Sequence, residues 1–142
     1  MAGLFVLLLN VSDIVSELQN FGANIDAQDS TGKTPLTYSV INRHIGTVRQ
    51  LLRLGANTEL RNYHEGATAL HFTLTHADND MLGCLLDGGA DIEARENQGF
   101  TPLLLAIHCF SPTSGNDLCH LLARGANVDA QESFTFVHLS AL

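Results

Sequence analysis

The sequence predicts a mainly α-helical repeat protein in which helix-turn-helix units stack side by side into a solenoid. One observation is a Gly-Ala pair that follows a leucine-rich run four times, at intervals of 33, 34 and 36 residues. These pairs begin at Gly22, Gly55, Gly89 and Gly125. A second observation is a threonine that recurs at intervals of 34, 33 and 34 residues, at Thr34, Thr68, Thr101 and Thr135. Two landmarks that keep nearly the same step indicate one structural unit copied along the chain.

The first helix of each unit is expected to start at the threonine landmark. In the clearest copy, the Thr34 side chain can accept a hydrogen bond from a free first-turn N–H, and Pro35 suits the first helical position. After a turn, hydrophobic residues at i, i+3 and i+4 predict a second helix over residues 47–54 with one buried face. Gly55 then ends this helix, because glycine adopts the left-handed cap conformation without a Cβ penalty.

The threonine landmark reads Thr34-Pro35-Leu36 in one copy and Thr68-Ala69-Leu70-His71 in the next. A period near 33 residues, with TPLH-like strings and leucine-rich runs that end in Gly-Ala, resembles the ankyrin repeat family over nearly the whole chain. The resemblance implies an ankyrin-repeat solenoid whose polar connectors project as β-hairpin-like fingers. It divides the single domain 1–142 into a partial unit, three full repeats and a second partial unit, over residues 1–28, 29–61, 62–95, 96–131 and 132–142.

Three departures from this pattern are visible. The third unit is three residues longer than the others, and Pro112 and Gly115 predict that residues 110–117 form a lengthened loop between its two helices. The fourth finger, at residues 131–134, lacks a turn glycine and is not expected to be regular. Both ends lack the polar outer face of a capping unit, so we expect an exposed apolar end surface, and a monomer if further sequence covers it.

The composition bounds the partners. With 142 residues, 45% of them hydrophobic, the chain can bury one continuous core. Its 15 acidic residues against 7 Lys and Arg give a formal net charge of −8, which opposes binding to nucleic-acid phosphates and to anionic membranes. We therefore expect other proteins as partners, with no nucleic acid and no membrane.

The cysteines and the N-terminal residues agree with that expectation. The three cysteines, Cys84, Cys109 and Cys119, are an odd number without the spacing of a disulfide framework, which favours a reducing compartment. The apolar N-terminus has no basic residue before Lys33 and is too short to span a bilayer. The sequence predicts a cytoplasmic or nuclear location.

Four acidic residues stand four positions after the repeated glycines, at Asp26, Glu59, Glu93 and Asp129. If the units stack, these residues form a column along the finger bases. We favour turn-forming polar residues on a solvated edge. The alternative is a strip that steers a basic partner, partly neutralised by Arg61 and Arg95.

Catalytic patterns are absent from the sequence, which has no P-loop, no GxGxxG after a strand and no GxSxG elbow. The main chemical cluster pairs soft ligands around the lengthened loop, at His108, Cys109, Cys119 and His120. Zinc takes such ligands, but the spacing is not that of a usual zinc site, and both cysteines lie near leucines. Packing or chance placement is favoured over metal, so no cofactor and no enzyme activity are expected.

The resemblance implies a protein-binding surface on the concave side, made of finger tips and first helices. The finger tips would offer Ser30, Thr31, Lys33, Tyr63, His64, Ala67, Asn97, Gln98 and Phe100. The first helices would add Ile41, Asn42, Thr75 and His76, with His108 and Cys109 as further candidates. Tyr63 and Phe100 are either exposed contact residues, as aromatic side chains often are at interfaces, or ordinary packing between fingers.

The leading hypothesis is thus a non-catalytic protein-protein interaction module that presents a concave surface, as part of a larger scaffold or adaptor. One alternative is a regulatory segment of a larger enzyme or channel. Another is a metal-dependent enzyme that uses His108, Cys109, Cys119 and His120.

Overall fold

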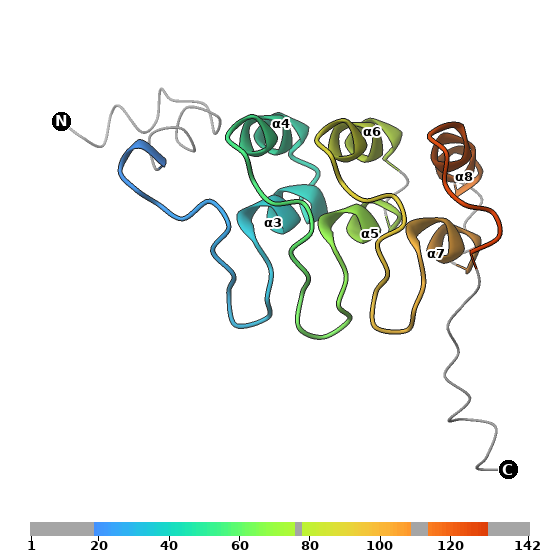
Figure 1. Ribbon diagram of the computed structural model, residues 1–142. Coiled ribbons are helices and arrows are strands. Elements are labelled where there is room, and N and C mark those ends of the chain that lie inside the picture. Colours follow the sequence, from blue (N-terminus) through green and yellow to red (C-terminus); the bar gives the residue numbers. More distant parts are fainter. Residues whose placement is uncertain (1–18, 76–77, 109–113, 131–142) are drawn as a thin grey trace, which may run out of the picture.

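The computed structural model describes residues 19–75, 78–108 and 114–130, and these contain helices and loops but no strand. The helices are α3 (Pro35–Ile41), α4 (Ile45–Arg53), α5 (Ala69–Thr73), α6 (Asn79–Asp87), α7 (Pro102–His108) and α8 (Ser114–Ala123). They form three pairs side by side, with α3, α5 and α7 in one row and α4, α6 and α8 in the other (Figure 1). The predicted solenoid of helix-turn-helix units is confirmed.

The first helix of the first described pair starts where the sequence places it. Thr34 is the N-cap of α3, and its Oγ1 accepts a hydrogen bond of 3.1 Å from the Thr37 amide. Pro35 occupies the first helical position, where its missing N–H leaves no donor unpaired. The second helix, α4, begins two residues before the predicted range and ends at Arg53.

The repeated Gly-Ala pairs close the second helices in one geometry. Gly55, Gly89 and Gly125 have φ values of 86°, 93° and 89°, in the left-handed region that favours glycine. After α4, the Gly55 amide donates to the Leu52 carbonyl and the Ala56 amide to the Leu51 carbonyl, each at 3.0 Å. This is the Schellman arrangement, which satisfies carbonyls that the end of the helix leaves free.

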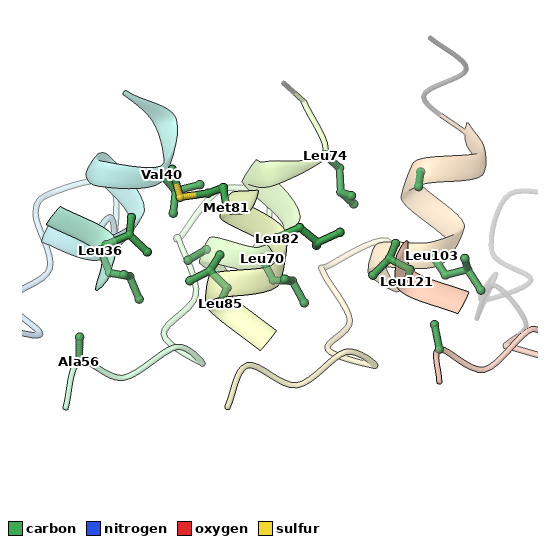
Figure 2. Packing of buried hydrophobic residues seen from close by; sticks show 14 of the residues in the cluster. Leu36, Val40, Ala56, Leu70, Leu74, Met81, Leu82, Leu85, Leu103 and Leu121 are labelled. Carbon is green, nitrogen blue, oxygen red and sulfur yellow. The ribbon is translucent and has the colours of Figure 1, made fainter. Parts of the chain in front are cut away.

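The hydrophobic core runs without interruption from one pair to the next (Figure 2). Each pair contributes from both of its helices, for example Leu70 of α5 with Leu82 and Leu85 of α6, all fully buried. The helices also contact their counterparts in the neighbouring pair, α3 against α5 and α4 against α6. Stability therefore depends on burial between units as well as within each unit.

The finger loops lie below the row of first helices and are tied to one another (Figure 1). Each loop is closed by its own backbone, as where the Asp29 amide donates to the Lys33 carbonyl at 3.0 Å. Neighbouring loops are joined by a bond from the Tyr63 amide to the Thr31 carbonyl, at 2.9 Å. The fingers are thus hairpin-like turns without a strand ladder in the described residues.

One expectation about the third unit is wrong. Gly115 was assigned to a lengthened loop, but α8 begins at Ser114 and includes it. A single glycine costs a helix only about 1 kcal/mol, so Gly115 does not prevent α8 from beginning at Ser114. Residues 109–113, the fourth finger at 131–134 and the outer parts of both end units lie outside the described residues.

Candidate protein-binding surface

The acidic column holds the repeats together. The Asp26 carboxylate accepts from the Asn57 amide of the next unit at 2.8 Å, and Glu59 accepts from the Asp91 amide at 2.9 Å. Glu93 continues the series by accepting from the Asn127 amide at 2.6 Å. The interpretation as turn residues on a solvated edge missed this bond between units, and three of the four acids are engaged in structure.

A second ladder runs parallel to the first. Arg61 donates from Nε to the Gly66 carbonyl of its own finger, at 2.7 Å, and from its terminal nitrogen to the Arg95 carbonyl of the next unit. Gln28 makes the equivalent pair of bonds one unit earlier, to the carbonyls of Gly32 and Arg61. Arg61 therefore fixes the spacing of the fingers, where the sequence suggested that it neutralises the acidic column.

We use the term finger face for the surface formed by loops 29–33, 62–67 and 96–100 and by helices α3, α5 and α7. A pocket of about 260 Å³ opens on it between the second and third loops. Four predicted binding residues line this pocket, Ala67, Thr75, Gln98 and Phe100. Five lining residues were not predicted, Glu65, His71, Phe72, Glu96 and Leu105.

The buried members of this set do not behave as exposed finger tips. Phe100 is only 7% exposed and Ala67 only 8%. The Phe100 ring meets the His108 ring edge to face, with centroids 5.3 Å apart and an interplanar angle of 71°. For Phe100 the structure thus decides between the two interpretations in favour of packing, although part of the ring still borders the pocket.

Tyr63 both packs and stays accessible. It is 62% exposed, and its ring covers Gly32, where an added Cβ would come within 2.7 Å of the Tyr63 ring. Gly32 also has a φ of +80°, so both the backbone and the close approach require glycine there. The ring is therefore held in place on the finger face while most of its surface faces solvent.

Several other predicted residues are partly engaged in structure. The Asp29 carboxylate accepts from the Thr31 hydroxyl and from the amides of Thr31 and Lys33. Asn97 donates from its side chain to the His64 carbonyl at 3.0 Å and thereby joins two fingers. Asn42 bonds to the Tyr38 carbonyl at 2.8 Å.

The remaining predicted positions differ in accessibility. Ser30, His64, Thr75 and Gln98 are exposed, Ile41 is half-buried, and His76 lies outside the described residues.

A column of large side chains on the first helices escaped the sequence analysis. Tyr38, Phe72 and Leu105 each stand four residues after a landmark threonine, so the stacked units place them in one row. Their matching position was the signal that could have found them. The Tyr38 hydroxyl donates to Asp29 and holds the pKa of that carboxyl well below its usual range.

His71 lines the pocket, and its hydrogen bonds select one tautomer of the neutral ring. Its Nδ1 accepts from the Thr68 amide at 3.2 Å, so the proton sits on Nε2, which donates to the Phe100 carbonyl at 3.4 Å. Burial of the ring lowers the pKa of His71. The imidazole is therefore neutral near pH 7 and adds no positive charge to the pocket.

The metal alternative gains no support from the geometry. Across the described ranges, no three His, Cys, Asp or Glu side chains come together as metal ligands. His108 ends α7, His120 and Cys119 lie on α8, and Cys109 is outside those ranges.

No helix in the part of the chain that the structure describes is long and apolar enough to cross a membrane.

Comparison with known proteins agrees with this architecture. The ankyrin repeat family profile matches residues 31–63, which overlap the first full repeat. The human B-cell lymphoma 3 protein is 34% identical over 125 residues, covering 84% of this chain and 26% of that protein.

Two other relatives are proteins of different kinds. A Caenorhabditis elegans homologue of transient receptor potential cation channel subfamily A member 1 is 31% identical over 132 residues, 91% of this chain and 10% of the channel. The mouse NF-kappa-B inhibitor delta is 31% identical over 94 residues, 65% of this chain and 28% of that protein. The chain thus matches between 10% and 28% of the length of these relatives. From its repeats, its fold and these matches, the chain belongs to the ankyrin repeat family.

Proposed function

We propose that this chain is a non-catalytic protein-interaction segment that binds a partner protein on its finger face. Ankyrin repeats mediate protein-protein interactions as a family. The observation that carries the proposal is the pocket between the second and third fingers, where four of the predicted binding residues meet. A concave site bordered by aromatic and polar side chains is the usual form of an anchoring point for a partner.

Rigidity of the finger face supports this role. Loops are held by bonds within each finger, between fingers, and from the side chains of Gln28 and Arg61. A surface that is ordered before binding loses little conformational entropy when a partner docks. The accessible Tyr63 ring then offers a large contact area at small entropic cost.

The chain is proposed to act as the recognition part of a larger scaffold or adaptor, because its relatives are several times longer. A regulatory segment within a larger protein is the second candidate, favoured by the match to a cation channel homologue. Among the described residues Cys84 and Cys119 form no disulfide, which fits a reducing compartment, and we propose a cytoplasmic or nuclear location.

Site-specific photo-crosslinking in cells tests the proposal. A photoreactive phenylalanine analogue replaces Tyr63 or Gln98 on the finger face, and in the matched control it replaces the exposed Arg53 of α4. Urea unfolding first establishes that the three proteins are equally stable. We expect a discrete crosslinked partner from positions 63 and 98 that position 53 does not give. Equal crosslinking from position 53, or no discrete partner from any position, would contradict the proposal.

A further inference from the structure

The pocket on the finger face combines an apolar wall with two carboxylates. Phe72, Phe100 and Leu105 supply apolar surface from α5, the third finger and α7, while Glu65 and Glu96 come from adjacent fingers. Glu96 accepts from the Phe100 amide at 2.9 Å, and Glu65 accepts from the Asn62 side chain. Each of these bonds uses one carboxylate oxygen and leaves the other for a ligand.

No Lys or Arg side chain lines this pocket, and the His71 ring that lines it is neutral near pH 7 because burial lowers its pKa. The nearby Arg61 directs its guanidinium to the carbonyls of Gly66 and Arg95. The ion pairs found in the described part of the chain, Arg43 with Asp78 and Arg124 with Asp87, involve α6 and α8 instead. Neither Glu65 nor Glu96 belongs to an ion pair in the described part of the chain, so both carboxylates can meet a cation from a partner.

Charge also segregates between the two sides of the solenoid. The described finger loops and their connectors carry eight acidic residues against three basic ones. The acids are Asp26, Asp29, Glu59, Glu65, Asp91, Glu93, Glu96 and Asp129, and the bases are Lys33, Arg61 and Arg95. On this side the summed field favours approach of a basic partner.

The size of the pocket limits what can occupy it. At about 260 Å³ it is smaller than the ~300–1,000 Å³ of most small-molecule sites, so a single side chain is the better fit. Arg and Lys lay their aliphatic stems along apolar surface and keep the charged end near solvent or a carboxylate. Phe72 and Phe100 also line the pocket, and aromatic rings attract a cation that lies over their faces.

We propose that this pocket receives an arginine or lysine side chain from the partner protein, with the charge held by Glu65 and Glu96 and the stem packed against Phe72 and Phe100. This inference rests on the proposed function, because it names the chemistry that the finger face recognises. It places the basic residue at the junction of the second and third fingers.

Selection from a randomised peptide display library tests the inference, with the immobilised full chain as bait. We expect enriched peptides to share an Arg or Lys at one fixed position. Replacement of that Arg or Lys by norleucine should weaken binding at least tenfold. In the double variant Glu65→Gln/Glu96→Gln, the same peptides should bind about tenfold more weakly, because the amide keeps the oxygen acceptor and loses the charge. Raising the salt concentration should weaken binding to the wild type more than to this variant.

The control is Asp80→Asn, which removes one charge from an exposed position on α6, away from the pocket. It should change the affinity less than twofold, and urea unfolding should show that all variants are folded. Peptides that bind the finger face without a shared basic residue would overturn the inference and leave the proposed function standing. Unchanged binding after Gln98→Trp, which fills the pocket, would also overturn the inference alone. A library that yields no binder would overturn both.

Discussion

At the scale of single residues, the hydrogen bonds of His71 depend on the protonation state of its ring. Its Nδ1 must be unprotonated to accept from the Thr68 amide, and its ring is buried beside the Phe100 carbonyl. Because burial lowers the pKa of His71 below the model-peptide value of 6.5, the unfolded chain takes up a proton before the folded chain does. The folded state is thus favoured fully above pH 6.5 and less as the pH falls below it.

We therefore expect the free energy of unfolding to decrease between pH 7.5 and pH 5.5, measured by urea titration. His71→Asn does not titrate there and should show a shallower decrease. Asp117, whose pKa burial raises, acts in the opposite direction in both proteins and cancels from the difference. Identical pH dependence in the two proteins would contradict this account.

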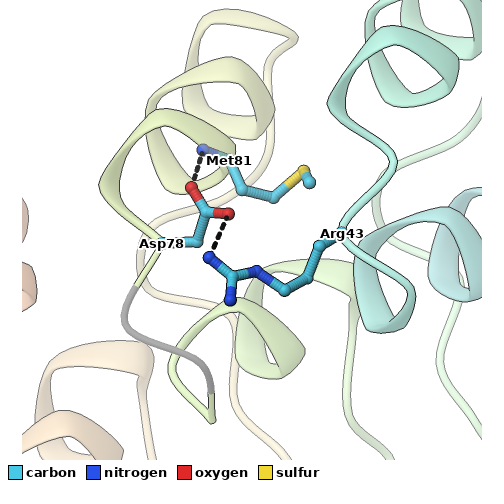
Figure 3. A network of polar contacts seen from close by, with 3 residues as sticks. All are labelled: Arg43, Asp78 and Met81. Atoms are coloured by element: carbon cyan, nitrogen blue, oxygen red, sulfur yellow. Dashed lines mark hydrogen bonds and ion pairs between the residues drawn. The ribbon is translucent and has the colours of Figure 1, made fainter.

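Arg43 shows a different kind of residue-level constraint. In the described residues it is the one non-glycine with a positive φ, at 59°. Its side chain is 60% exposed and lies 3.5 Å from Asp78, which in turn caps α6 by accepting from the Met81 amide (Figure 3). A surface ion pair of this kind contributes only about 0–1 kcal/mol. The left-handed conformation costs a non-glycine residue roughly 1–2 kcal/mol, so the two effects are of comparable size.

Comparison of Arg43→Gly with Arg43→Ala isolates that strain, because both variants lose the ion pair. The glycine variant should be more stable by about 1 kcal/mol, since glycine adopts the left-handed conformation freely. Urea unfolding of the two proteins measures the difference. An alanine variant at least as stable as the glycine variant would show that the backbone at position 43 is not strained.

At the scale of elements, hydrogen bonds from side chains to backbone groups organise the connectors between units. Glu59 and Arg61 follow the same Gly-Ala pair, and each reaches the backbone of the following unit, at Asp91 and Arg95. These bonds join neighbouring units, whereas backbone bonds such as that from the Asp29 amide to the Lys33 carbonyl close each finger. They set the distance between units at the finger side, while the core sets it at the helix side.

Removal of one rung should therefore loosen two units at once. We expect Glu59→Ala to lower the free energy of unfolding by about 1 kcal/mol, because the Asp91 amide loses its acceptor. Glu59→Gln keeps an acceptor oxygen and should lose less than half as much. Chemical denaturation of both variants tests the rung, and equal stability of the two would contradict it.

At the scale of the whole molecule, the solenoid is held by contacts between neighbouring units. Leu51 of α4 is buried in the core that the units share, whereas Lys33 lies at a finger tip. Leu51→Ala should cost roughly 2–5 kcal/mol through the cavity it opens, and Lys33→Ala should be nearly neutral. Equal effects in urea unfolding would contradict the placement of the repeats.

The periodic part of this structure could be predicted from the sequence. Thr34 with Pro35 marked the start of α3, and Gly55 marked the end of α4, because helix caps depend on the chemistry of one or two neighbouring residues. The hydrophobic period located the core for the same local reason. The start of α8 could not be predicted, because a glycine lowers the stability of a helix by less than the packing of that helix can raise it.

Only part of the candidate site could be predicted in this way. The finger positions followed from the repeat, and Tyr63 is exposed as a contact residue would be. Burial of Phe100 and Ala67 depends on the neighbouring finger and on α5 and α7, which a repeat pattern does not describe. Glu65 and Glu96 enter the pocket for the same reason, since two adjacent units must meet to form it.

The sequence by itself determined the repeat, the helix boundaries set by caps, the apolar core and the net negative charge, because each depends on residue type and spacing. The tertiary structure decided which acids bind backbone, which aromatic ring is accessible and where two carboxylates meet in one pocket. The physical reason is distance: these properties arise between residues about one repeat apart in sequence, and only stacking of the units brings them into contact.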